Sequence, residues 1–257
     1  MFCNDQCKAG IQLTTSGFHL SLDDCPMTTE EIEHMSKVPY SSAVESLIYV
    51  MLSTHPDICF TIGMISRYQT NLGHRYWQSI KHILRYPKRT KDYMLVYSEE
   101  DFTLVGYTYS NFQTYKDSRK STSGNVFILG CRAIVWRSVK QICTVDSTTE
   151  AEYVAVSEAM KESNMVSKFL IEFEVILGME KNITLYCDNN VAITNSKEMR
   201  CHKRARHIDR KYHLIQEAVA EGIVDVMKVA TENNLADLFT KNLVTRSFNK
   251  HVEDMGM

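Results

Sequence analysis

The chain has 257 residues, 29 Lys and Arg, 31 Asp and Glu, and a formal net charge of −2. Hydrophobic residues make up 44% of it, with only 10 Gly and 4 Pro, which excludes a disordered, low-complexity or collagen-like chain. No uninterrupted apolar run of about 18 residues occurs, and no basic segment followed by an apolar one opens the chain. We therefore expect an intracellular globular protein, of the cytoplasm or nucleus, with no signal peptide, no transmembrane segment and no membrane partner.

The cysteines are scattered along the chain and form no Cys-x-x-Cys pair. In a chain long enough to build its own hydrophobic core, this pattern indicates reduced thiols rather than a disulfide framework. Cys3 and Cys7 are close enough in sequence to bind a metal together, but a loose terminus is the favoured interpretation.

The first third of the chain predicts short helices. Residues 1–36 are expected to be irregular, although an acidic Thr-Thr-Glu-Glu run within them can start a helix through an N-cap. Apolar residues at helical spacing predict helices at 40–53, 56–65 and 75–85, and the last of these must end near Pro87. This all-helical part ends at about residue 94.

Beyond that point the pattern changes to β-type runs. Strands are predicted at about 94–98, 102–110, 122–130, 133–137, 183–187 and 223–229. Helices are predicted at about 148–161, 165–177, 208–219 and 234–241. Strands that come first, followed by alternating helices and strands, favour an α/β fold in which helices pack on a mixed sheet.

Basic residues gather in two clusters, although the net charge is small. The span 75–91 holds six Lys or Arg and no acid, and the span 197–211 holds seven Lys or Arg against two acids. Such clusters can neutralise phosphates, and the interleaved aromatic residues can stack on bases. The alternative is a pair of solvated helix faces. The candidate nucleic-acid-binding residues are Arg85, Lys88, Lys203, Arg204, Arg206 and His207.

Three acids occupy special positions in the predicted elements. Glu152 lies in the first turn of a helix, Asp188 follows a strand, and Asp237 lies in a short helix near the end. If they converge at one edge of the sheet, their oxygens suit Mg²⁺, and two such ions can activate a water at a phosphate. The alternative is three unrelated surface charges or helix caps.

Six segments of the chain, taken in order, resemble a known family, the C-terminal part of the copia-type LTR-retrotransposon Pol polyprotein. The resemblance covers nearly the whole chain. The segments are VPYSSAVESLIYVMLSTHPDI (38–58), KDSRKSTSG (116–124), STTEAEYVA (147–155), LYCDNN (185–190), KRARHIDRKYHLI (203–215) and NLADLFTK (234–241).

The resemblance implies an irregular N-terminal segment (1–36), a helical remnant of a reverse-transcriptase connection (37–94), a ribonuclease H-like domain (95–243) and a C-terminal tail (244–257). The implied fold is α/β, a ribonuclease H-like five-stranded mixed sheet flanked by helices and preceded by a small helical segment. The implied activity is two-metal hydrolysis of the RNA strand in RNA–DNA hybrids.

The resemblance also implies roles for individual residues. Glu152, Asp188 and Asp237 match by position three catalytic, metal-binding acids of the family. The segment 203–213, which includes His207, matches a basic helix region near the hybrid. Nucleic acid, as an RNA–DNA hybrid, is therefore the expected partner.

The sequence departs from the family where the first catalytic aspartate is expected. That aspartate lies in a Tyr-x-Asp-x-Asp segment, which here reads GYTYSNFQ (106–113). Tyr109 stands at the lost fourth catalytic position and Asn111 at the second acid. Tyr115 stands where an acid is common, and the histidine expected near Asn233 is missing.

A phenol is neutral at physiological pH and cannot replace a carboxylate that bridges two metal ions. We therefore expect Mg²⁺ binding to be weak or absent, and this copy of the enzyme to be impaired while still binding hybrid. Two alternatives stay open. One is a residually active Mg²⁺ nuclease in which another acid replaces the lost one. The other is a non-catalytic nucleic-acid-binding or protein-interaction module, effector-like, that keeps only the fold. The sequence predicts no oligomeric state.

Overall fold

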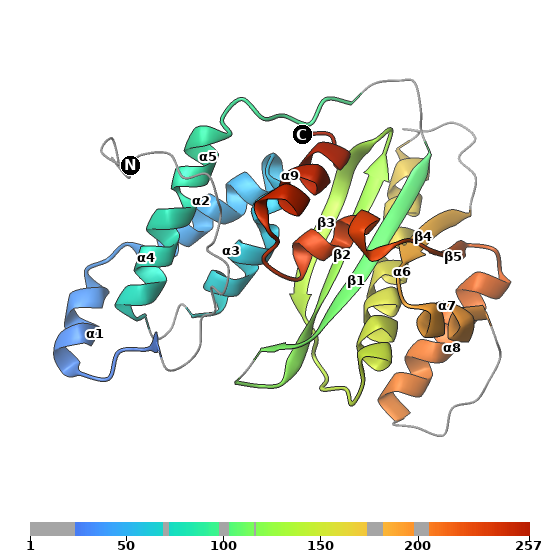
Figure 1. Ribbon diagram of the computed structural model, residues 1–257, viewed down its shortest axis with the longest axis horizontal. Helices are drawn as coiled ribbons and strands as arrows, with labels where there is room; N and C mark the ends of the chain where they lie inside the picture. The colour runs from blue at the N-terminus through green and yellow to red at the C-terminus, as the bar shows by residue number, and fades with distance from the viewer. Residues whose placement is uncertain (1–23, 69–71, 98–102, 116, 174–181, 198–205) are drawn as a thin grey trace. The chain divides into compact units, whose positions relative to one another are not determined.

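The computed structural model describes residues 24–68, 72–97, 103–115, 117–173, 182–197 and 206–257 (Figure 1). The chain divides into two compact units. The first contains Met1–Met94 with Asn242–Arg246, and the second contains Leu95–Lys241 with Ser247–Met257. Within the described part, no helix is both long enough and apolar enough to cross a bilayer.

The first unit is helical. Its elements are α1 (Thr29–Ser36), α2 (Tyr40–Ser53), η2 (Pro56–Ile58), α3 (Cys59–Ile65), η3 (Ser66–Tyr68), α4 (His74–Ile83) and α5 (Arg85–Arg89). Helix α1 begins at the acidic run within the segment expected to be irregular. There Thr28 and Glu31 form a capping box, in which each side chain accepts a hydrogen bond from the other residue's backbone N–H.

The sequence predicts that a helix ends near Pro87. In the structure Pro87 instead lies inside α5. The preceding helix α4 stops at Ile83, and α5 starts two residues later. Pro87 is therefore the third residue of a new helix. In the first turn a backbone N–H has no partner within the helix, so a proline costs little there.

A buried polar cluster joins the η2 turn to α5. The hydroxyl of Tyr86 donates a hydrogen bond to the carboxylate of Asp57, which is 2% exposed. Nearby, the Nε2 atom of His55 lies 3.1 Å from the hydroxyl of Thr90. Buried polar groups with partners of this kind tie specific residues together, because leaving one of them unpaired is costly.

The second unit is built on a five-stranded mixed sheet in the order β3-β2-β1-β4-β5. Its strands are β1 (Leu104–Tyr115), β2 (Lys120–Leu129), β3 (Arg132–Lys140), β4 (Ile183–Cys187) and β5 (Val224–Lys228). The pairs β1–β2 and β2–β3 are antiparallel, whereas β1–β4 and β4–β5 are parallel. The prediction that 102–110 and 183–187 are neighbouring strands is confirmed, since Gly106 pairs with Leu185.

Helices flank this sheet (Figure 1). They are α6 (Thr148–Glu172), α7 (Asn190–Lys197), α8 (Arg206–Ala220), η4 (Thr231–Asn233), η5 (Leu235–Phe239) and α9 (Thr245–Asp254). Buried side chains of α6, such as Tyr153 and Val156, pack with Leu185 of β4, Val226 of β5 and Ile215 of α8 in one core cluster. The predicted α/β class and the five-stranded mixed sheet flanked by helices are confirmed.

Three local predictions differ from the structure. The strand predicted at 94–98 is absent from its described residues, 94–97. There the Val96 carbonyl accepts from the Arg132 side chain, and the Tyr97 hydroxyl donates to a carbonyl of β3, so side chains replace a strand ladder. The two helices predicted at 148–161 and 165–177 are one continuous helix, α6, because no Gly or Pro interrupts residues 162–164.

The third difference concerns the segment 244–257, predicted to be a tail, in which α9 forms. His251, Val252 and Met255 are buried, and the backbone N–H of Ala133 donates to the Met255 carbonyl at 3.1 Å. An amphipathic turn with apolar residues three or four positions apart explains why this end of the chain is ordered against the sheet.

Candidate active site

The centre of the site is β1, where successive side chains point to opposite faces of the sheet. On one face, the Asn111 side chain donates to the Thr240 carbonyl, which follows η5, at 3.3 Å. On the other face, Gln141 donates to the Ser110 hydroxyl at 3.3 Å and to the α6 carbonyl of Ala151 at 2.9 Å. Tyr109 therefore shares the face of β1 that η5 covers.

Gly124 makes this close approach of η5 possible. It pairs with Tyr109 across β1 and β2. A Cβ atom at Gly124 would lie 2.7 Å from the Ala236 carbonyl oxygen and 2.9 Å from the Phe239 Cβ atom. Only a residue without a side chain leaves room for η5 at this point, so a glycine is required by contact rather than by backbone torsion.

Glu152 is held in the first turns of α6 with its carboxylate directed at β1. Its Oε1 atom accepts a hydrogen bond from the backbone N–H of Ser110 at 3.0 Å. Its Oε2 atom is buried and makes no hydrogen bond to a described residue. Burial, followed by the negative charge of Asp188, raises the pKa of Glu152 well above its usual range.

Asp188 lies directly after β4, at the carboxyl end of a parallel strand. The hydroxyl of Thr231 in η4 donates to its Oδ2 atom at 2.8 Å. The Sγ atom of Cys187, the last residue of β4, and one carboxylate oxygen each from Glu152 and Asp188 lie within 4.8 Å of one another. Burial, with a contribution from the charge of Glu152, raises the pKa of the Cys187 thiol to about 12.

Asp237 lies in η5 and forms an ion pair with a lysine one turn further on. The Nζ atom of Lys241 is 2.7 Å from Oδ1 of Asp237. The same Nζ atom is 3.4 Å from the Tyr109 hydroxyl and 4.9 Å from the centroid of its ring. Burial raises the pKa of Asp237, and Lys241 opposes that rise.

The structure brings together the acids that the sequence singles out, in two linked parts. Glu152 and Asp188 belong to the group that Cys187 completes, while Asp237 pairs with Lys241 outside that group. The charge of Asp237 still contributes to the raised pKa of Glu152, and the charge of Asp188 contributes to the raised pKa of Asp237. Tyr109 touches the second part through Lys241, and its pKa is raised, mainly by burial.

The side chains present do not fit a Mg²⁺ ion well. Mg²⁺ prefers oxygen ligands in an octahedron, including negatively charged carboxylates. The compact group offers two carboxylates and the buried thiol of Cys187, and sulfur is a poor ligand for Mg²⁺. The third carboxylate, Asp237, is already neutralised by Lys241 at 2.7 Å.

Two residues of this site were missed in the sequence. Cys187 directly precedes Asp188, and its spacing alone gives it no chemical role. Lys241 was visible as the last residue of the NLADLFTK segment. A lysine four residues after an acid in a helical turn is a standard ion-pair spacing, so this contact with Asp237 could have been predicted.

The candidate nucleic-acid-binding residues are only partly described. Arg85 is half-buried and Lys88 is exposed, both in α5 of the first unit. Arg206 and His207 begin α8 in the second unit, where the backbone alone is described. Lys203 and Arg204 lie outside the described residues, as do Cys3 and Cys7.

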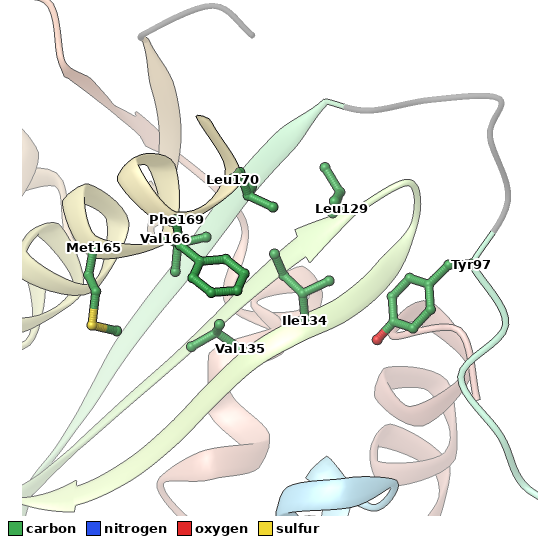
Figure 2. Close-up of a pocket in the computed structure, with 8 residues that line it drawn as sticks. All are labelled: Tyr97, Leu129, Ile134, Val135, Met165, Val166, Phe169 and Leu170. Atoms are coloured by element: carbon green, nitrogen blue, oxygen red, sulfur yellow. The ribbon is translucent and has the colours of Figure 1, made fainter. Parts of the chain in front are cut away.

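A cavity unrelated to the acids lies beside the second half of α6. Its volume is about 550 Å³, and Figure 2 shows apolar side chains from α6, β2 and β3 directed into it together with Tyr97. Met165 and Phe169, which line it from α6, are 58% and 55% exposed. None of the described residues that line the cavity carries a charge, so these residues offer no carboxylate or ammonium group like those of the acidic site.

A mixed sheet in the order β3-β2-β1-β4-β5, with acids on α6, after β4 and in η5, defines a ribonuclease H-like α/β domain. Comparison with known proteins then identifies the family. Over 242 residues, 93% of its length, the chain is 42% identical to the retrovirus-related Pol polyprotein from transposon TNT 1-94 of Nicotiana tabacum. The chain belongs to the family of retrotransposon Pol polyproteins, and it spans 18% of the length of that relative.

The chain is also similar to a secreted effector protein and to a solved ribonuclease H structure. The chain is 38% identical over 130 residues to secreted RxLR effector protein 161 of Plasmopara viticola, covering 50% of this chain and 92% of that protein. A solved LC11-RNase H1, isolated from compost, aligns with a TM-score of 0.40 and 17% identity over 58% of this chain and 97% of its own. No protein-family model matches the chain.

Proposed function

We propose that this chain is a retrotransposon-derived ribonuclease H-like domain that binds RNA–DNA hybrids and cleaves them poorly or not at all. The proposal is carried by Tyr109, which the resemblance matches to the family's first catalytic aspartate, and whose hydroxyl lies 3.4 Å from the Nζ atom of Lys241. Two-metal hydrolysis depends on a carboxylate that bridges both ions and holds the attacking and leaving oxygens between them. A neutral phenol beside an ammonium group supplies no such ligand.

Hybrid binding needs no metal chemistry, only charge and shape along the phosphate backbone. The basic residues of α5, Arg85 and Lys88, and those at the start of α8 support it by their charge. Contacts of this kind make affinity fall steeply as salt rises, because each neutralised phosphate releases a counterion. The ancestral substrate surface can therefore persist after the catalytic group is lost.

The experiment pairs a binding assay with a cleavage assay on the same labelled hybrid. We expect anisotropy to report binding that weakens log-linearly with salt, and gels to show no RNA cleavage in Mg²⁺ over the same time. A double-stranded DNA of the same sequence is the control that tests whether the protein distinguishes a hybrid duplex from a DNA duplex. Efficient cleavage by the unmodified protein would show that another acid replaces the lost aspartate and would overturn the proposal.

A second candidate is a non-catalytic protein-interaction module that keeps only the fold. Two observations favour it. The similarity to the Plasmopara viticola effector covers 92% of that protein, and exposed apolar side chains gather on α6. Phe169 of α6 and Phe173, which directly follows α6, have tilted rings with centroids 4.5 Å apart, and each is more than half exposed. A hybrid titration separates the two candidates, since the module predicts no binding even at low salt.

A further inference from the structure

Lys241 pairs with one of the three acids of the site, Asp237, as a bound cation would. Its ammonium lies 2.7 Å from one carboxylate oxygen of Asp237 and 4.9 Å from the centre of the Tyr109 ring. The side chain of Lys241 is 34% exposed and that of Asp237 is 9% exposed, so this pair is partly withdrawn from water. An ammonium between a carboxylate and an aromatic face is attracted by both.

Hydrogen bonds from the protein occupy one oxygen of each of the other two acids. Glu152 uses one oxygen to accept from the Ser110 N–H, and Asp188 uses one to accept from Thr231. The remaining member of their group is the Cys187 sulfur, which is a soft ligand and suits Mg²⁺ poorly. The family's hard-metal site has thus lost its bridging acid, while a positive charge already balances Asp237.

We infer that the Lys241 ammonium is the resident cation of this acidic site, so that the folded protein needs no divalent ion there. The statement that the folded protein needs no divalent ion does not depend on which ligand the domain binds. Its extension, that hybrid binding is independent of divalent metal, rests on the proposed function. An ordinary surface ion pair between Lys241 and Asp237 would have neither consequence, because removing it would not expose a metal site.

The first test titrates MgCl₂ into the full chain. Calorimetry and the melting temperature report binding, and NaCl at matched ionic strength is the control for salt. Wild type should show no saturable Mg²⁺ response at millimolar concentration. Lys241→Met keeps the apolar stem but removes the charge, and it should bind Mg²⁺ at least about tenfold more tightly. Lys241→Arg, which keeps the charge, should behave like wild type.

Lys161→Met is the matched control, since Lys161 is an exposed lysine of α6. It should leave the response to Mg²⁺ unchanged. If Lys241→Met does not fold, Lys241→Gln takes its place as a neutral, polar variant. Equal Mg²⁺ affinities for wild type and the neutral Lys241 variant would overturn the inference, as would saturable binding to wild type at micromolar concentration.

The second test measures hybrid affinity in EDTA and in MgCl₂ at matched ionic strength. Equal affinities in the two solutions support the inference, and loss of binding in EDTA overturns it. Failure to bind hybrid in both solutions overturns the proposed function and not the assignment of Lys241, which the Mg²⁺ titration decides by itself.

Discussion

The Nζ atom of Lys241 lies 3.4 Å from the hydroxyl of Tyr109, although 132 positions separate the two residues in the chain. Tyr109 is on β1 and Lys241 follows η5, so the contact exists only because η5 crosses the face of β1. It joins Tyr109, which we propose stands at the position of the family's first catalytic aspartate, to the ion pair of Asp237. In the proposed assignment, the position that lacks the catalytic carboxylate and the Lys241 ammonium are therefore in contact in the fold.

Restoring the lost acid should restore some chemistry. Tyr109→Asp returns a carboxylate to β1 beside Glu152, Asp188 and Asp237, and it adds a negative charge that can hold a metal ion in addition to Lys241. We expect Mg²⁺-dependent cleavage of a fluorescent RNA–DNA hybrid to become measurable. The rate should remain at least about 100-fold below that of an intact site, because the histidine expected near Asn233 is absent.

Tyr109→Phe is the control for the change at position 109, because it removes the hydroxyl without adding charge. It should stay inactive. If Tyr109→Asp folds and binds hybrid but cleaves nothing, the damage to the site extends beyond one residue.

Charge on α5 should contribute to hybrid binding in a salt-dependent way. Replacing both Arg85 and Lys88 by Ala should weaken hybrid affinity at low salt. It should also reduce the slope of log affinity against log salt by up to about one unit per residue. Fluorescence anisotropy over a NaCl series measures both quantities. Lys37→Ala is the control, since Lys37 is an exposed lysine of the same unit. An unchanged slope in the double variant would place the phosphate contacts elsewhere.

The buried carboxyl of Asp57 should make stability fall as pH rises. Burial raises its pKa from 3.8 to about 7, and the hydrogen bond from Tyr86 opposes this rise. Because the folded-state pKa is the higher one, the stabilising contribution is complete below about pH 4 and is lost as pH increases to about 7. The free energy of unfolding in urea should therefore be lower at about pH 8 than at about pH 5, by up to about 3 kcal/mol.

Asp57→Asn removes this titration and keeps an amide that can accept from Tyr86. Its stability should vary less over the same pH range. An identical pH dependence in the variant would assign the effect to other buried acids, such as Glu152 and Asp237, whose pKa values are also raised.

The contact between Gly124 and η5 should be intolerant of a methyl group. In Gly124→Ala the new Cβ would meet the Ala236 carbonyl oxygen at 2.7 Å and a Thr240 methyl group at 2.8 Å. We expect a loss of about 1–3 kcal/mol in the free energy of unfolding, because η5 must move away from β1. Ser138→Ala, beside Gly124 on β3, should change stability by less than about 0.5 kcal/mol. A Gly124→Ala variant as stable as wild type would show that η5 shifts freely.

Much of the architecture is encoded in local patterns of the sequence. The apolar runs of β1 and β4 identify them as strands, and strands followed by alternating helices and strands predict the mixed sheet. The Thr-Thr-Glu-Glu run predicts the start of α1, because a capping box is made by residues three positions apart. Boundaries were less predictable. The apolar run at 94–97 forms no strand; the Arg132 side chain donates to the Val96 carbonyl, and the Tyr97 hydroxyl donates to the Ala133 carbonyl of β3.

The sequence by itself predicted which acids form the candidate site, at which position the resembled family's acid is absent, and which family the chain resembles, because these depend on residue type and order. Only the tertiary structure decided which groups contact Tyr109 and these acids. The partners of Tyr109 and Glu152 come from residues 132 and 42 positions away, Lys241 and Ser110. Contacts over such separations depend on how η5 and α6 pack against β1, since packing and not local propensity brings those side chains within bonding distance.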